Sequence, residues 1–134
     1  MNIVYLTLHY EHFNPIRQRV KTSEVRLANN VTDQVVQNGY ILFHSTNRTH
    51  GIRQKQDRLI VQVNGVERFE DLEYLMELRD HHSILPFVNS KEEAIQKLRE
   101  FHSLTTGEDL YLFDFEYVNN RDAKRIGLRS HLTR

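Results

Sequence analysis

The chain has 134 residues, no cysteine and a formal net charge of zero, which predicts one domain. The lack of thiols excludes disulfides, cysteine-based zinc sites and a cysteine nucleophile. No stretch approaches the roughly 18 apolar residues of a membrane span, and the N-terminus lacks the basic region and small-residue cleavage site of a signal peptide. We therefore expect a cytoplasmic protein without a membrane partner.

The charge is unevenly distributed along the chain. Residues 119–134 contain five basic residues and one acidic residue, a net charge of +4, and the rest of the chain carries −4. Such a segment could contact phosphate, or it could be a flexible, solvated terminus. We predict a domain over residues 1–118 and a basic C-terminal tail over residues 119–134, with flexibility of the tail left open.

Hydrophobic alternation predicts four strands in the first half of the chain. The first is apolar on both faces, which indicates a central strand, and Pro15 after it suits the first turn of a short helix. The turn-rich stretch around Gly51 predicts that the third and fourth strands form a hairpin with a long basic tip. The four strands are expected over residues 2–8, 21–27, 40–45 and 59–66.

The second half of the chain predicts two helices and a last strand. Apolar residues from Phe69 to Leu78 recur at helical spacing and form one face. Ser90 and Glu93 form a capping box that begins the second helix. In residues 110–118 aromatic side chains occupy alternate positions, so the aromatic side should face the core. Strands scattered among short helices indicate an α+β fold.

Histidines and carboxylates carry weak signals. The eight histidines lack metal-site spacing, and we predict no metal and no other cofactor. His81 and His82 are adjacent, so their side chains should point apart. Asp114 and Glu116 share a strand face. Such a pair could do acid–base chemistry or form a solvated outer face.

The predicted hairpin tip is rich in basic residues. Arg48, Arg53 and Lys55 lie within it, and a basic loop beside a sheet suits contact with phosphate. A hairpin tip is also commonly solvated and charged, so both interpretations stay open.

The stretch "VKTSEVR" carries closely spaced charges on a predicted strand. In an extended strand Thr22, Glu24 and Arg26 face one way and Lys21 faces the other. Glu24 and Arg26 are close enough to pair, and Arg26 offers a planar fork for phosphate or a base edge. The alternative is a surface ion pair of little energetic value. Lys21 joins the other two charges only if the strand is bent or bulged there.

Taken together, these motifs resemble the ASCH domain, the activating-signal-cointegrator homology domain of the PUA-like superfamily. The resemblance covers residues 6–118, and its most specific motif is the Lys-Thr-x-Glu-x-Arg strand. It implies a PUA-like small mixed β-barrel flanked by short helices, with an RNA-binding cleft beside that strand. The matching stretches are "VKTSEVRL", "NGYILF", "LIVQVNGVERFEDLEYLM", "SKEEA" and "LYLFDFEYV".

Two departures from the family pattern bear on function. One branch of the family is an amidohydrolase that acts on an acetylated cytidine through Lys-x-x-Thr and a separate Glu. Here Lys21 matches the lysine, Glu24 stands in place of the threonine, and no Glu occurs in "LPFVNS". The family's Gly-Asp is Gly39-Tyr40 here, and the Tyr40 ring could stack on a base.

We therefore expect a protein that recognises RNA or a nucleotide-like ligand. The alternatives are a hydrolase, either a nucleoside amidohydrolase or ribonuclease-like, that uses Lys21 and Glu24, and a protein-interaction module. The oligomeric state is left open. The predicted ligand-binding residues are Lys21, Thr22, Glu24, Arg26, Tyr40, Arg48, Arg53 and Lys55.

Overall fold

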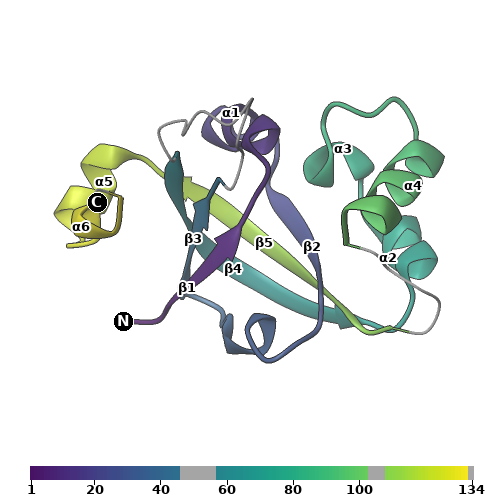
Figure 1. Ribbon diagram of the computed structural model, residues 1–134, viewed down its shortest axis with the longest axis horizontal. Coiled ribbons are helices and arrows are strands. Elements are labelled where there is room, and N and C mark those ends of the chain that lie inside the picture. Colours follow the sequence, from purple (N-terminus) through teal and green to yellow (C-terminus); the bar gives the residue numbers. More distant parts are fainter. Residues whose placement is uncertain (46–56, 103–107, 133–134) are drawn as a thin grey trace, which may run out of the picture.

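The computed structural model describes residues 1–45, 57–102 and 108–132. A mixed five-stranded sheet with the strand order β1-β3-β4-β5-β2 curls into a half-barrel, with short helices at both ends (Figure 1). The strands are β1 (Ile3–Thr7), β2 (Ser23–Leu27), β3 (Tyr40–His44), β4 (Arg58–Phe69) and β5 (Leu110–Val118). The helices are η1 (Tyr10–His12), α1 (Phe13–Arg17), η2 (Thr32–Gln34), α2 (Leu72–Leu78), α3 (His81–Ile84), α4 (Lys91–His102), α5 (Asn120–Arg125) and α6 (Arg129–Leu132).

The predicted α+β class and the five predicted strands are confirmed. The strands β3 and β4 pair in antiparallel fashion, as expected for a hairpin. The prediction that the first strand is central was wrong, because β1 pairs in parallel with β3 only and lies at the edge of the sheet. Its outer face is apolar for another reason: the Tyr5 ring lies edge-on against His131 of α6, at 6.0 Å between ring centroids.

Buried apolar side chains form three clusters. The interior cluster draws on β1, β3, β4, β5 and α1, the helical cluster joins β2 and β5 to α2, α3 and α4, and the C-terminal cluster joins the sheet to α5. Side chains from both faces of β5 are therefore buried, although Glu116 is exposed, and the predicted single core face was incomplete. The buried residues of β5 are shared among the clusters: Phe113 and Phe115 lie in the interior cluster, Leu110 and Leu112 in the helical cluster, and Val118 in the C-terminal cluster.

Helix starts follow their capping residues. Helix α2 begins at Leu72, because Asp71 accepts a hydrogen bond from the Glu73 amide, whereas Phe69 still belongs to β4. Ser90 Oγ accepts from the Glu93 amide at 3.1 Å, which confirms the predicted start of α4. The Glu93 carboxylate accepts from the Asn89 amide, one residue before the position expected for a capping box.

The basic C-terminal segment folds onto the sheet as far as the structure describes it. Ala123 and Leu128 are buried in the C-terminal cluster, and the Tyr5 hydroxyl lies 2.6 Å from His131 Nδ1. The segment contains helices α5 and α6, and its flexibility stays an open prediction. The predicted domain boundary at residue 118 stays a prediction. No described helix has the length and apolar character needed to cross a bilayer.

Candidate ligand-binding cleft

The charged stretch at the start of β2 forms a buried cluster. Lys21 precedes the first residue of the strand, Ser23, so strand alternation does not apply to it. Its side chain is completely buried, and Nζ lies 2.9 Å from Glu24 Oε1. Nζ also donates to the carbonyl oxygens of Ser23, at 3.0 Å, and of Ile84 in α3. Burial lowers the pKa of Lys21, and the Glu24 carboxylate opposes that shift.

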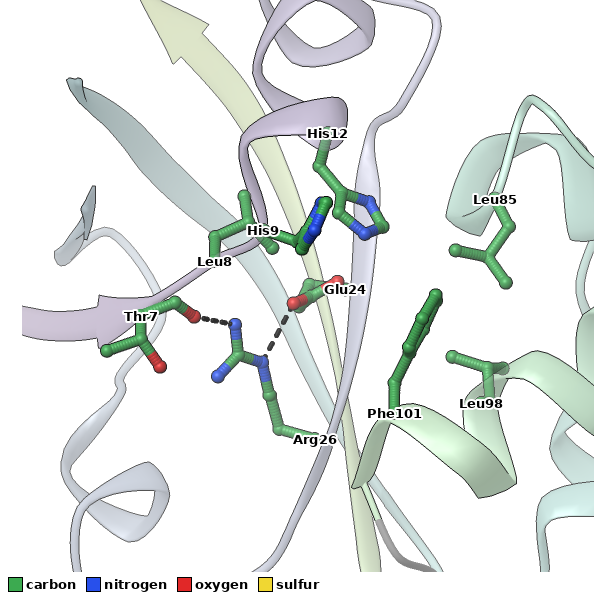
Figure 2. A pocket seen from close by; sticks show the side chains of 9 residues that line it. All are labelled: Thr7, Leu8, His9, His12, Glu24, Arg26, Leu85, Leu98 and Phe101. Carbon is green, nitrogen blue, oxygen red and sulfur yellow. Dashed lines mark hydrogen bonds and ion pairs between the residues drawn. The ribbon is translucent and has the colours of Figure 1, made fainter. Parts of the chain in front are cut away.

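Glu24 joins two cations. Its second carboxylate oxygen accepts a hydrogen bond from Arg26 Nε at 2.8 Å. The Arg26 guanidinium also donates through Nη2 to the Thr7 carbonyl oxygen of β1 (Figure 2). Arg26 therefore bridges β2 and β1, the two edge strands of the sheet. Lys21, Glu24 and Arg26 together carry a net charge of +1.

A cavity of about 240 Å³ lies beside this cluster. In Figure 2 the carboxylate of Glu24 and the guanidinium of Arg26 face the cavity from β2, and the Phe101 ring faces it from α4. This volume lies below the roughly 300–1,000 Å³ of a drug-sized pocket and suits a smaller ligand. The lining residues are Thr7, Leu8, His9, His12, Glu24, Arg26, Leu85, Leu98 and Phe101.

Aromatic rings surround one histidine of the cavity. His12 is buried, and the rings of Phe87 and Phe101 pack edge-on against it at centroid distances of 5.3 and 6.1 Å. Burial, followed by the charge of Lys21, lowers the pKa of His12 from 6.5 to about 4. His12 is therefore a neutral imidazole at pH 7, and its Nδ1 has no hydrogen-bond partner in the described part of the chain.

The structure separates the predicted site residues into four groups. Glu24 and Arg26 line the cavity, and Lys21 lies behind Glu24 without exposed surface. Thr22 is not among the lining residues; its amide donates to Ser83 O and its carbonyl oxygen accepts from the Phe115 amide. Tyr40 packs against the C-terminal cluster, so its ring does not reach the cavity. Arg48, Arg53 and Lys55 lie outside the described residues.

Sequence reasoning missed much of the cavity wall. His12 lies in η1 and His9 directly before it, whereas Phe101 lies near the end of α4, far away in the sequence. The histidines were visible in the sequence, but no metal-site spacing marked them. Phe101 was not among the predicted site residues, and 45% of its surface is exposed.

The paired carboxylates of β5 have separate environments. Asp114 accepts from Ser23 Oγ at 2.6 Å and pairs with Arg79 at 3.1 Å, which ties β5 to β2 and to the end of α2. Asp114 therefore has a structural role in these contacts. Glu116 is exposed to solvent, as the second of the two interpretations of this pair expected for both residues.

The adjacent histidines do not point apart as predicted. The His81 and His82 rings lie 4.0 Å apart between centroids, at the start of the short helix α3. Together with Asp80 they place possible ligand atoms within 4.8 Å of one another. Asp80 already caps α3 by accepting from the His82 amide, and the absence of a metal stays a prediction.

Comparisons with known proteins agree with this architecture. No protein-family model matches the chain, and no curated protein matches it. The hypothetical protein PH0355 has a TM-score of 0.68 at 22% identity, over 87% of this chain and 99% of its own. Protein PF0455 from Pyrococcus furiosus has a TM-score of 0.61 at 22% identity, over 87% and 98%. ASCH from Zymomonas mobilis has a TM-score of 0.59 at 16% identity, over 93% and 78%.

These likenesses define the class of protein. The chain is an α+β protein whose curled sheet and short helices have the PUA-like architecture. In particular, it has the fold of the ASCH domain, as the Lys-Thr-x-Glu-x-Arg motif predicted.

Proposed function

We propose that the cleft beside β2 binds a nucleotide-like ligand, a single unpaired base of RNA in the first instance. The observation that carries this proposal is the buried Glu24 carboxylate, held between Lys21 and Arg26 at a cavity whose opposite wall carries the Phe101 ring. Sequence-specific RNA recognition uses unpaired bases that stack on aromatic rings and hydrogen-bond through their edges.

Each part of the cleft matches one part of such a ligand. The Glu24 carboxylate is only an acceptor, so it selects an edge with an N–H donor. The partly exposed Phe101 ring supplies a stacking surface. Arg26, with the net charge of +1 in its cluster, is suited to a phosphate or a base acceptor. The neutral His12 adds no charge that would favour an anion deep in the cavity.

Calorimetric titration with short single-stranded RNAs and with the four nucleoside monophosphates, over a series of salt concentrations, tests the proposal. Phe101→Ala should weaken binding by roughly 5- to 150-fold, the range for loss of one base-stacking contact. Because Phe101 is 45% exposed, this variant should stay folded. The matched control is Tyr74→Ala, which removes an exposed aromatic ring from α2 outside the cavity. Absence of binding by the unaltered protein at low salt contradicts the proposal.

Glu24→Gln tests the acceptor, with affinity measured only where circular dichroism shows that the variant is folded, because the change also removes the countercharge of Lys21. It should weaken binding, because an amide can present a donor where the ligand needs an acceptor. The control is Glu116→Gln, the same chemical change at an exposed carboxylate of β5. Arg26→Ala should weaken binding and reduce its salt dependence, whereas Arg125→Ala removes an exposed arginine outside the cavity.

The hydrolytic alternative rests on Glu24 and His12, which line the same cavity. His12 is neutral at pH 7, but its pKa of about 4 makes it a weaker base than an ordinary imidazole. Lys21 lies behind Glu24 and would act through that carboxylate rather than on a substrate. Incubation with acetylated nucleosides and short RNA, followed by mass spectrometry, distinguishes the two functions, since a binding protein returns both unchanged.

A further inference from the structure

A second cavity of about 470 Å³ lies next to the first. Arg26 lines both cavities. Along β1 the lining passes from Thr7 in the first cavity to Leu6 in the second, and along β2 it passes from Glu24 to Leu27. The two cavities therefore follow one another between the edge strands, with Arg26 at their junction. The second is lined by Leu6, Arg26, Leu27, Asn29, Asn30, Val31 and Thr32.

The Arg26 guanidinium is partly committed at this junction. Nε donates to Glu24 and Nη2 to the Thr7 carbonyl oxygen. Within the described residues no hydrogen bond of Nη1 is seen, and Figure 2 shows this nitrogen directed away from both partners. The side chain is 14% exposed. A fixed cation that keeps both N–H groups of Nη1 for a ligand, at the junction of two cavities, is suited to an anionic group that joins two ligand parts.

The wall of the second cavity is preorganised. Asn29 Oδ1 accepts from the amides of Val31 and Thr32, both at 2.9 Å, which fixes the turn. Asn30 is exposed, and Val31 is 47% exposed. This wall offers two amide side chains, one hydroxyl and three apolar side chains, and among the described residues Arg26 is its one charged residue. Such a surface suits the uncharged sugar and base of a nucleotide rather than its phosphate.

We propose that the binding site extends over both cavities and takes at least two consecutive nucleotides of single-stranded RNA. One base occupies the first cavity, the linking phosphate meets Arg26, and the next nucleoside lies against Asn30 and Val31. This inference rests on the proposed function. It adds that the site spans at least two nucleotides and that the ligand is an RNA strand rather than a free nucleotide. An added peptide strand between β1 and β2 fits less well. The Arg26 side chain spans the gap between these strands and already donates to the Thr7 carbonyl oxygen that such a strand would use.

Length dependence of binding tests the extension. Titration calorimetry compares the four nucleoside monophosphates with the four homodinucleotides and with dinucleosides joined by an uncharged methylphosphonate. The tightest dinucleotide should bind at least about fivefold more strongly than its monophosphate, the low end for one added base contact. The methylphosphonate should lose most of this gain, since the linking charge no longer meets Arg26.

Two exposed valines of the same loop give a matched pair of variants. Val31→Asp places a negative charge in the second cavity and should abolish the gain from length. Val36→Asp places the same charge outside both cavities, at a residue that is 45% exposed, and should leave the gain intact. Both substitutions are on exposed side chains, so folding should be preserved.

The outcomes separate the two proposals. Equal affinity for monophosphates and dinucleotides overturns the extended site and leaves the single-base cleft standing. A length gain that Val31→Asp and Val36→Asp reduce equally also overturns it, because the effect then comes from general charge. Failure of every nucleotide and oligonucleotide to bind overturns the proposed function as well.

Discussion

The Lys21 ammonium and the Glu24 carboxylate lie 2.9 Å apart in the interior of the protein, and both side chains are buried. The carbonyl oxygens of Ser23 and Ile84 complete the surroundings of the ammonium. Because Glu24 also lines the cavity, this ion pair links the stability of the core to the wall of the binding site.

Glu24→Gln should destabilise the protein by about 3–5 kcal/mol, because removal of one partner leaves the buried Lys21 without a countercharge. Urea unfolding followed by circular dichroism gives the free energy of unfolding. The double variant Lys21→Met/Glu24→Gln should recover much of the loss, since it removes the buried charge as well. Glu116→Gln, at an exposed residue of β5, should change stability by less than about 0.5 kcal/mol. Equal effects of the two single substitutions would refute the role of the buried pair.

His12 should make the protein less stable in acid. Its pKa is about 4 in the folded protein against 6.5 in the reference state, so between these values the unfolded chain holds the extra proton. The free energy of unfolding therefore falls as the pH drops from 6.5 towards 4, by up to about 3 kcal/mol. Urea unfolding at pH 7 and pH 4 should show this loss in the unaltered protein and a smaller one in His12→Gln. Parallel pH profiles of the two proteins would contradict the expectation.

Leu128 should anchor the C-terminal segment to the sheet. It is buried in the C-terminal cluster with Leu42 and Ile60, so Leu128→Ala should cost about 2–5 kcal/mol of stability. Leu78→Ala, at a leucine that is exposed on α2, serves as the control and should cost less than about 0.5 kcal/mol. Thermal unfolding of both variants decides the matter, and a neutral Leu128→Ala would show that the segment contributes little to the fold.

Ser90→Ala should remove the cap of α4. Loss of the hydrogen bond from the Glu93 amide to Ser90 Oγ should cost about 1 kcal/mol. The opposite end of the helix carries Leu98 and Phe101, which line the cavity, so ligand affinity should stay within about twofold if only the first turn frays. Ser130→Ala, at an exposed serine of α6, should leave stability unchanged. A large loss of affinity in Ser90→Ala would show that the cap positions the whole helix.

The periodicity of side chains was enough to predict the elements. Five strands, the start of α4 and the hairpin of β3 and β4 followed from alternation, capping and turn residues, because these patterns act between neighbours in the chain. The Lys-Thr-x-Glu-x-Arg motif predicted the ASCH-domain fold, because the motif is local in sequence and lies on one particular strand within a fixed order of strands.

Strand alternation failed where the chain leaves the strand. It placed Lys21 opposite Glu24, but β2 begins only at Ser23, and the hydrogen bond from the Thr22 amide to the Ser83 carbonyl draws the preceding backbone towards α3. Strand pairing likewise decided the position of β1, which lies at the edge of the sheet beside β3, so apolar residues on both of its faces did not mark a central strand.

The sequence by itself therefore determined the elements, the fold class and one wall of the candidate site, through Glu24 and Arg26. Tertiary structure alone brought His12 and Phe101 to the opposite wall and turned Tyr40 away towards the C-terminal helices. The physical reason is the distance along the chain over which each effect acts: periodicity and capping relate residues only a few positions apart. The cavity instead forms where the edge strands β1 and β2 approach each other and the end of α4 packs beside them, and no local pattern encodes that approach.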